Sequence, residues 1–472
     1  MTTLRYFTYP LFFFFGFSLT SCQGADTLKI TLHRSFLTAS KINLTSVDMI
    51  SMESMSIGHV LHRATNQTIL GVIIPQSQFA SLEIDGVFIP LFLEPGYDLQ
   101  LYLDTLSRQP SVRFEGHSAS ANTYLTKANA IRMRVEQSAG KFYFELSAAE
   151  FVTHLKATKG LYAQLDQTFL AKLTLADSLK EVLSGRNQAN LAFMQQNYAM
   201  THPQPNQPAD PLNVAGPPLP FSPHFIQTKM AEYAMVMNVY VSYTLPNLLG
   251  LQQMSSEQKS LLVDQYIQTG TFTPAEKEYL RAKNVHAWLT LVGISPETDV
   301  LFARYKTSFP HSVYFPTLAQ LYHKWSTLAP GQPAPDFYGV TPMGDTLALS
   351  SLKGKVVYVD VWATWCGPCR AEFPQAKQLQ QQFSADSAVV FLYVSIDQNQ
   401  AAWKKLLQED PQFEGVHINQ VSTEQAGSLW KPYLLSGIPR YLLIDQQGRI
   451  VQANADRPSS GKVAEAIQKL LF

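Results

Sequence analysis

The sequence predicts a multidomain protein with an N-terminal β-sandwich-like domain, a mostly α-helical middle region and a C-terminal α/β domain. The chain has 472 residues, which is more than one hydrophobic core usually organises, since a domain holds roughly 100 to 200 residues. The spacing of its apolar residues also changes twice, near residues 116 and 328. Hydrophobic residues make up 46% of the chain and charged residues 15%, as is typical of folded domains.

The balance of charge argues against one class of partner. Lys plus Arg and Asp plus Glu both number 36. The chain therefore has no net positive charge that would attract a phosphate backbone, and we expect no nucleic acid partner.

The first 21 residues have the layout of an export signal. A cation at Arg5 precedes an apolar stretch from Leu11 to Leu19, which is shorter than the roughly 20 residues that span a bilayer. The tetrapeptide "LTSC", ending at Cys22, resembles the bacterial lipobox, which implies cleavage before Cys22 and acylation of that cysteine. We expect residues 1–21 to be a lipoprotein signal peptide; a plain secretory signal is the alternative.

Residues 22–116 are predicted to form a small antiparallel β-sandwich. Apolar residues alternate there with period two, which indicates strands with one buried face. Turn formers such as Pro95-Gly96 separate the runs. The alternating residues are Leu28, Ile30 and Leu32 and, further on, Leu99, Leu101 and Leu103.

Residues 117–328 are predicted to be mostly helical, because apolar residues recur there at helical spacing. Eight prolines lie between Pro203 and Pro223. Each lacks the N–H that a helix interior uses, so residues 203–223 are expected to form a loop between two helical halves. A docking motif in extended form is the alternative for this loop. The stretch "GQPAP", which begins at Gly331, marks the expected boundary with the last domain.

Residues 329–472 are predicted to form a central sheet covered by helices on both faces. The runs "KVVYVDVWA" and "AVVFLYVSID" are typical of buried strands, and "NQAAWKKLLQ" is typical of a helix. The segments "RYLLID" and "RIVQA" predict a hairpin around Gly448. A final helix is expected from about Gly461 to Leu471.

Two of the three cysteines, Cys366 and Cys369, follow the first of these strands in "WCGPC". A disulfide between them would close a very short loop and restrict the unfolded chain little, so it is a poor structural staple. A helix that begins at Gly367 or Pro368 would place Cys366 at its N-terminus, where the helix dipole favours a thiolate. We expect Cys366 to attack a disulfide and Cys369, one turn further on, to resolve the mixed disulfide.

The order of strands and helices, together with "WCGPCRAEFP" at 365–374 and "GQPAPDF" at 331–337, resembles the TlpA/ResA-like branch of exported thiol-disulfide oxidoreductases, which have the thioredoxin fold. The resemblance covers residues 329–472. It implies a protein-disulfide reductase that works through its two cysteines and needs no cofactor.

The resemblance also implies roles for residues around the cysteines. Asp360, inside an otherwise apolar strand, would lie beneath them with a raised pKa and shuttle a proton for Cys369. The alternative is a structural aspartate paired with a basic residue. Pro439 would be cis and face the cysteines, and Ile438 would offer its backbone to an extended substrate. Trp365 is either an apolar contact for the partner or an ordinary packing residue.

The remaining motif residues would tune the site. Gly367 and Pro368 match the dipeptide of thioredoxin, whose potential of about −270 mV lies about 150 mV below that of DsbA, and this match favours a reductant. Glu372 either tunes the site or is simply solvated, and Pro374 is expected to kink the helix.

The expected partners and location follow from the same resemblance. A reductant in an oxidising compartment needs a source of electrons, which implies a membrane donor of the DsbD/CcdA kind. The acceptors would be disulfide-bearing exported proteins, such as apocytochrome c. A lipid on Cys22 would anchor the chain in the cell envelope, facing the periplasm, with the outer membrane favoured over the inner.

Three alternatives remain open. Thiol peroxidases share the fold, but the chain lacks the Pro-x-x-x-Thr-x-x-Cys context of peroxiredoxins. An envelope binding or adaptor protein with a vestigial redox module would act through its first 330 residues. Half of a zinc site would explain the cysteine pair, but the chain has no second C-x-x-C, and we expect no metal.

Overall fold

The computed structural model describes residues 27–34, 41–64, 67–104, 111–138, 141–202, 219–409, 414–421 and 427–471. The described residues fall into two compact units. Unit 1 holds those up to Asp48, 53–188 and 224–231, and unit 2 holds 49–52, 189–223 and those from Glu232 onward. The predicted signal peptide, Cys22 and most of the proline-rich loop lie outside the described residues.

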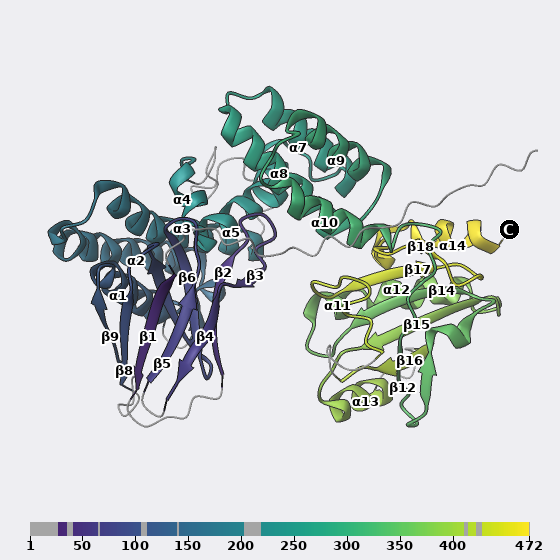
Figure 1. Cartoon of the computed structure of the whole chain (residues 1–472). Coiled ribbons are helices and arrows are strands. Elements are labelled where there is room, and N and C mark those ends of the chain that lie inside the picture. Colours follow the sequence, from purple (N-terminus) through teal and green to yellow (C-terminus); the bar gives the residue numbers. More distant parts are fainter. Residues whose placement is uncertain are drawn as a thin grey trace, which may run out of the picture. The chain divides into compact units, whose positions relative to one another are not determined.

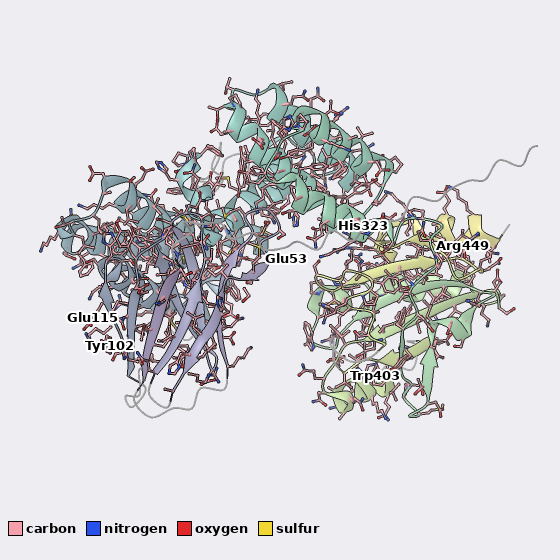
Figure 2. The ribbon with its side chains drawn as sticks, in the orientation of Figure 1. Glu53, Tyr102, Glu115, His323, Trp403 and Arg449 are labelled. Carbon is pink, nitrogen blue, oxygen red and sulfur yellow. A yellow bond between two sulfur atoms is a disulfide. The ribbon has the colours of Figure 1, made fainter. Side chains whose placement is uncertain are left out.

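Two β-sheets with a shared apolar core form the strand-rich part of unit 1. The strands of the larger sheet, in spatial order, are β4 (Gly58–Arg63), β5 (Gln67–Val72), β1 (Leu28–Arg34), β8 (Leu99–Asp104) and β9 (Ser111–Gly116). Those of the smaller sheet are β3 (Ser54–Ser56), β2 (Ile42–Val47), β6 (Gln78–Ile84) and β7 (Val87–Leu93). On the larger sheet, the Tyr102 hydroxyl of β8 donates a hydrogen bond to Glu115 of β9 over 3.1 Å (Figure 2).

The prediction of a wholly antiparallel sandwich is wrong at one pair of strands. Strands β1 and β8 run parallel, with Ile30 opposite Leu99 and Leu32 opposite Leu101. The alternating leucines are buried as predicted. Alternation shows which side of a strand is buried but not which way the strand runs. The chain passes through the smaller sheet between β1 and β8, so β8 can return in the direction of β1.

The middle of the chain is mostly helical, as predicted. Its helices are α1 (Ala119–Val135), α2 (Ala148–Thr168), α3 (Asp177–Thr201), α4 (Pro223–Gln227), α5 (Ala231–Val239), α6 (Leu245–Leu248), α7 (Ser256–Thr269), α8 (Pro274–Val292), α9 (Pro296–Ser308) and α10 (Phe315–Ser326). Between α1 and α2 lie the short strands β10 (Gln137–Ser138) and β11 (Lys141–Phe142), and a π-helical turn, Tyr240–Thr244, precedes α6.

Capping side chains set where several of these helices begin. The hydroxyls of Ser255, Thr273 and Ser295 each accept a hydrogen bond from the amide three residues later, at the starts of α7, α8 and α9. Helices α7, α8 and α9 pack on one another, and α10 packs on α8 (Figure 1).

A four-residue turn between β2 and β3 belongs to unit 2 rather than to the sheet that flanks it. The Tyr279 hydroxyl of α8 donates to the Met49 carbonyl over 3.3 Å, and the buried Lys283 ammonium donates to the Ile50 carbonyl over 3.1 Å. These two hydrogen bonds join the turn to α8.

A seven-stranded mixed sheet organises the C-terminal part of unit 2. Its strands, in spatial order, are β13 (Thr346–Ala348), β12 (Tyr338–Val340), β16 (Val416–Asn419), β15 (Val389–Ser395), β14 (Val356–Trp362), β17 (Arg440–Ile444) and β18 (Ile450–Gln452). Its helices are α11 (Gly367–Ala371), α12 (Phe373–Gln382), α13 (Gln400–Glu409) and α14 (Val463–Leu471). Strand β14 pairs in parallel with β15 and antiparallel with β17. The predicted strands, hairpin and final helix are all present.

The helical segment that begins at Gly367 is divided into two helices rather than kinked. Helix α11 ends at Ala371, and α12 begins at Phe373. Pro374 has no N–H to donate to the carbonyl of Arg370, so one continuous helix cannot form across this point. Within the described residues, no helix combines the length and apolarity needed to cross a bilayer.

Candidate active site

Cys366 and Cys369 form a disulfide at the point where β14 gives way to α11. Their Cα atoms lie 5.3 Å apart. Cys366 is the N-cap residue of α11, and its Sγ accepts a hydrogen bond from the Cys369 amide over 3.2 Å. Cys366 is 5% exposed and Cys369 only 1%, so Cys366 is the more accessible of the two residues. An amide that donates to sulfur favours the charged form of that sulfur once the disulfide opens.

Asp360 lies in the middle of the sheet, where β14 is flanked on both sides. It is opposite Tyr393 of β15 and Tyr441 of β17. Its side chain is buried, and its Oδ1 atom has no hydrogen-bond partner in the described part of the chain. Burial raises the pKa of Asp360 well above its usual value, and the nearby Glu372 carboxylate raises it further. These contacts do not fit the alternative of an aspartate paired with a basic residue.

The tyrosines around Asp360 stay neutral for the same reasons. Burial raises the pKa of Tyr358, Tyr393 and Tyr441, and the Asp360 carboxylate adds to the effect in each case. The Tyr358 hydroxyl donates to the Asp456 carbonyl over 2.7 Å. Tyrosine rings therefore surround Asp360, and Glu372, the charged group that acts on it, is itself acidic.

Glu372 is held in place rather than solvated. It is 7% exposed and lies between α11 and α12. The amide and hydroxyl of Ser459 donate to its two carboxylate oxygens over 3.0 and 2.9 Å. The Arg457 guanidinium lies 3.9 Å from the same group. Neither Ser459 nor Arg457 was predicted from the sequence, because no local pattern marks them as partners of Glu372.

The Ile438–Pro439 peptide bond is cis, as the family resemblance implies. Arg440, the next residue, pairs with Val361 near the end of β14. Ile438 packs against the apolar cluster that includes both cysteines. The cis bond therefore lies beside the strand end from which the cysteine loop leaves. Trp365 is 68% exposed, so its ring contributes little to core packing.

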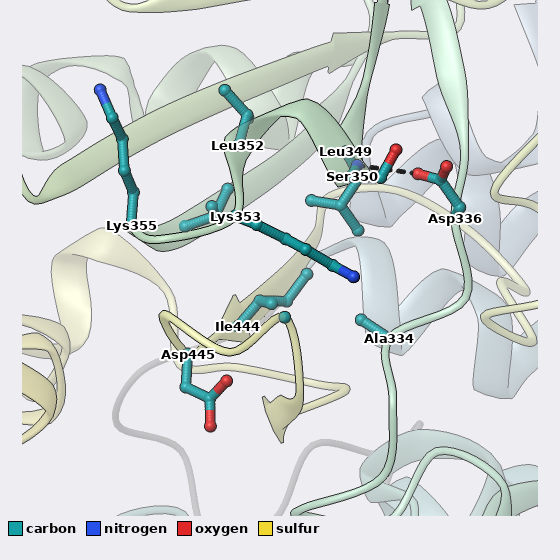
Figure 3. Close-up of a pocket in the computed structure, with 11 residues that line it drawn as sticks. Ala334, Asp336, Leu349, Ser350, Leu352, Lys353, Lys355, Ile444 and Asp445 are labelled. Atoms are coloured by element: carbon teal, nitrogen blue, oxygen red, sulfur yellow. Dashed lines mark hydrogen bonds between the residues drawn. The ribbon is translucent and has the colours of Figure 1, made fainter.

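A pocket of about 250 Å³ opens at the opposite end of the same sheet. It is lined by Val357 from the start of β14 and Ile444 from the end of β17, with the Lys353 side chain extending across it (Figure 3). The antiparallel pairing of these strands places this pocket away from the cysteines. Within the described ranges, no three His, Cys, Asp or Glu side chains gather as metal ligands would.

A disulfide whose first cysteine caps the helix after the central strand, with a buried acid in that strand and a cis-proline beside the strand end, is the arrangement of thioredoxin-fold oxidoreductases. Residues 329–470 match the family model described as Redoxin. Thiol-disulfide oxidoreductase ResA of Bacillus thuringiensis is 27% identical over 141 residues, which cover 30% of this chain and 78% of the relative. ResA of Bacillus subtilis is 28% identical over 126 residues, or 27% of this chain and 67% of the relative.

Solved structures give similar matches. The thioredoxin domain of a thiol-disulfide oxidoreductase from Bacteroides vulgatus is 28% identical, and the match covers 30% of this chain and 99% of that one, with a TM-score of 0.27. The C-terminal domain belongs to the Redoxin family, in the ResA/TlpA-like branch. The protein is a thiol-disulfide oxidoreductase.

Proposed function

We propose that this protein reduces disulfides in exported proteins through Cys366 and Cys369. The observation that carries this proposal is the unequal placement of the two sulfurs. Both cysteines belong to the same apolar cluster, but Cys366 is 5% exposed and its Sγ accepts the Cys369 amide at the start of α11, whereas Cys369 is 1% exposed. A sulfur that is stabilised as an anion and is the more accessible one suits attack on a partner, and the deeper sulfur suits the second, intramolecular step.

In the reducing direction, the Cys366 thiolate attacks one sulfur of the client disulfide. An S–S bond forms between Cys366 and the client, and the client's other sulfur leaves as a thiolate and takes up a proton. Cys369 then loses its proton and attacks Cys366 Sγ, which releases the second client thiol and leaves the Cys366–Cys369 disulfide. Two electrons pass to the client, and a membrane dithiol donor of the DsbD/CcdA kind must return them.

Asp360 is the proposed acceptor of the Cys369 proton. A carboxylate that lies in an apolar sheet without a cation takes up a proton readily, because burial disfavours its charge. Trp365, Ile438 and Pro439 would contact the client chain. Glu372 would tune the pKa of Asp360 through its charge. The Gly367-Pro368 dipeptide supports the reducing direction, since it matches that of thioredoxin.

We further propose that the chain acts in the cell envelope, held by a lipid on Cys22 and facing the periplasm. The support is the export-type N-terminus with its lipobox-like "LTSC". Residues 22–328 would select or position the client, for which apocytochrome c is one candidate.

The test is turnover of insulin disulfides with dithiothreitol as the electron source. Wild type should catalyse the reaction, and Cys366→Ser should lose all turnover, because the remaining cysteine of the pair, Cys369, is only 1% exposed and is poorly placed to meet a client disulfide. Cys369→Ser should be inactive in turnover but should accumulate mixed disulfides through Cys366, which non-reducing electrophoresis detects.

Two results would overturn the proposal. Turnover by Cys366→Ser equal to that of wild type would show that the site is not this cysteine pair. Absence of turnover in wild type, with peroxide consumed instead, would favour the peroxidase function.

A further inference from the structure

A buried carboxylate outside the cysteine motif holds the loop that carries Cys366. Asp397 lies two residues after β15 and is 1% exposed. Its Oδ1 and Oδ2 accept the Thr364 amide over 3.1 and 2.9 Å. Its Oδ1 also accepts the Thr364 hydroxyl over 2.6 Å. Both donors of Thr364 are therefore directed at one charged group, and hydrogen bonds to charged groups are stronger than those between neutral ones.

Asp397 is itself held on the side away from Thr364. The Ser395 hydroxyl donates to Asp397 Oδ2 over 2.9 Å, and the Asp397 amide donates back to that hydroxyl over 3.1 Å. The Asn419 side-chain amide of β16 donates to Ser395 Oγ over 2.9 Å and to the Asp397 carbonyl over 3.0 Å. Ser395 and Asn419 are both buried. A connected polar network around the carboxylate thus links the C-terminal ends of β14, β15 and β16.

Thr364 stands in the short loop between β14 and the cysteine. The Ile396 amide donates to the Trp362 carbonyl over 2.9 Å at one end of this loop, and the Cys366 amide donates to the Ala363 carbonyl over 3.0 Å at the other. Thr364 lies inside the turn that the second of these hydrogen bonds closes. Fixing it therefore limits where the Cys366 backbone can go, and with it the alignment of Cys366 Sγ with the Cys369 amide.

We propose that Asp397 is a positioning residue for the redox reaction: through Thr364 it holds Cys366 where its sulfur accepts the Cys369 amide. The importance of this role rests on the proposed function of Cys366. Asp397 does not itself touch the sulfurs through any hydrogen bond in the described residues; it acts on them through the loop.

The test measures how fast iodoacetamide alkylates Cys366 in the reduced full-length chain at a fixed neutral pH, with peptide mass spectrometry to separate Cys366 from the other cysteines. Asp397→Asn replaces an oxygen by an NH₂ group that would face a donor, and Thr364→Val removes the hydroxyl but leaves the amide. Each should slow alkylation roughly two- to tenfold, the range expected when one hydrogen bond no longer supports the reactive form. Thr364→Ser keeps the hydroxyl and should react like wild type.

Asp445→Asn is the matched control, because Asp445 also caps a turn, accepting the amides of Gln447 and Arg449 at the far end of β17. It should leave the alkylation rate unchanged. The proposal fails if Asp397→Asn speeds alkylation while Thr364→Val has no effect, since the carboxylate would then act only through its charge. It also fails if both variants melt at lower temperature but alkylate at the wild-type rate. Alkylation requires no client, so a failed insulin assay would leave this result standing.

Discussion

At the scale of single residues, Asp360 is an acid buried in the central strand of the sheet. Its carboxyl group lies in the central strand, and Oδ1 has no hydrogen-bond partner in the described part of the chain. An ionised carboxylate in such surroundings destabilises the folded state, whereas a protonated one costs much less. The folded protein would be more stable at neutral pH with an asparagine at this position. Groups that lower stability in this way are common at reactive sites.

This reasoning predicts how stability depends on pH. The native pKa of Asp360 lies above its unfolded value, so the native state binds the proton more tightly. The stabilisation of the folded state by this tighter proton binding is fully present below the ordinary aspartate pKa of about 3.9. It is lost as the pH rises through the native pKa of Asp360. Each unit of difference is worth about 1.4 kcal/mol. Asp360→Asn should therefore match wild type near pH 3.5 and be the more stable protein at pH 8.

Urea unfolding of the oxidised proteins at several pH values would measure this gap. Asp345→Asn, at an exposed position of the same domain, should follow wild type throughout. A constant difference between Asp360→Asn and wild type at all pH values would show that Asp360 does not titrate with a raised pKa. In the insulin assay, an unchanged pH profile in Asp360→Asn would remove its proposed role as proton acceptor.

At the scale of elements, a short 3₁₀ turn holds the junction between two helices. The turn Pro458–Ser460 supplies both donors to Glu372, at the junction of α11 and α12. Pro374 prevents one continuous helix there, so the junction depends on contacts from outside the helix. The position of the cysteine-bearing helix α11 is thus set partly by a segment near the C-terminus.

Ser459→Ala should lower the free energy of unfolding by about 1 kcal/mol, the usual contribution of one partly exposed hydrogen bond, because Glu372 would lose the hydroxyl but keep the amide of residue 459 and the nearby Arg457 guanidinium. Ser460→Ala is the matched control: this neighbouring serine is equally exposed, and its hydroxyl accepts the Lys462 amide over 3.2 Å. Chemical denaturation of both variants would measure the difference. Equal losses in the two variants would contradict a specific role for Ser459.

At the scale of the whole molecule, unit 2 joins helical and sheet segments through a buried tryptophan. Trp325 of α10 is 1% exposed. The Arg440 guanidinium lies 5.3 Å from the centre of its ring, and Arg440 also donates to the Ala453 carbonyl over 3.1 Å. Burial lowers the pKa of Arg440 to about 10. The aromatic face gives a buried cation, next to the cis-proline, a favourable contact that it would otherwise lack.

Trp325→Ala should cost about 3–5 kcal/mol, the usual loss for a large buried aromatic side chain. Because the ring packs on Arg440, hydrogen exchange should become faster in β17 as well as in α10. Trp365→Ala removes an indole that is 68% exposed and should leave exchange in both elements unchanged. Faster exchange confined to α10 in Trp325→Ala would show that the helical and sheet parts of unit 2 are not coupled by this contact.

Features that depend on neighbours in the chain were predictable. The strand containing Asp360 follows from a local apolar pattern and the helix start at Gly367 from a short motif. The cis bond before Pro439 was implied by the family resemblance. The separation of α11 from α12 was only partly predicted, because Pro374 indicates a disturbance but not its extent.

Features that depend on distant residues were not predictable. Thr364 and Asp397 are 33 positions apart, and Glu372 and Ser459 are 87 apart. Serine, threonine and aspartate are common on surfaces and in turns, so nothing in their local sequence indicates that they meet. The parallel pairing of β1 with β8 was missed for a related reason, since the alternation of apolar residues does not indicate in which direction a strand runs.

The sequence by itself determined the chemistry, because a dithiol, its place after a buried strand and an acid within that strand are all encoded within a few consecutive residues. The tertiary structure alone decided which side chains support that chemistry. Asp397, Ser459 and Arg440 reach the site only after the strands have been ordered and paired, and that order depends on the packing of the whole domain rather than on any one segment.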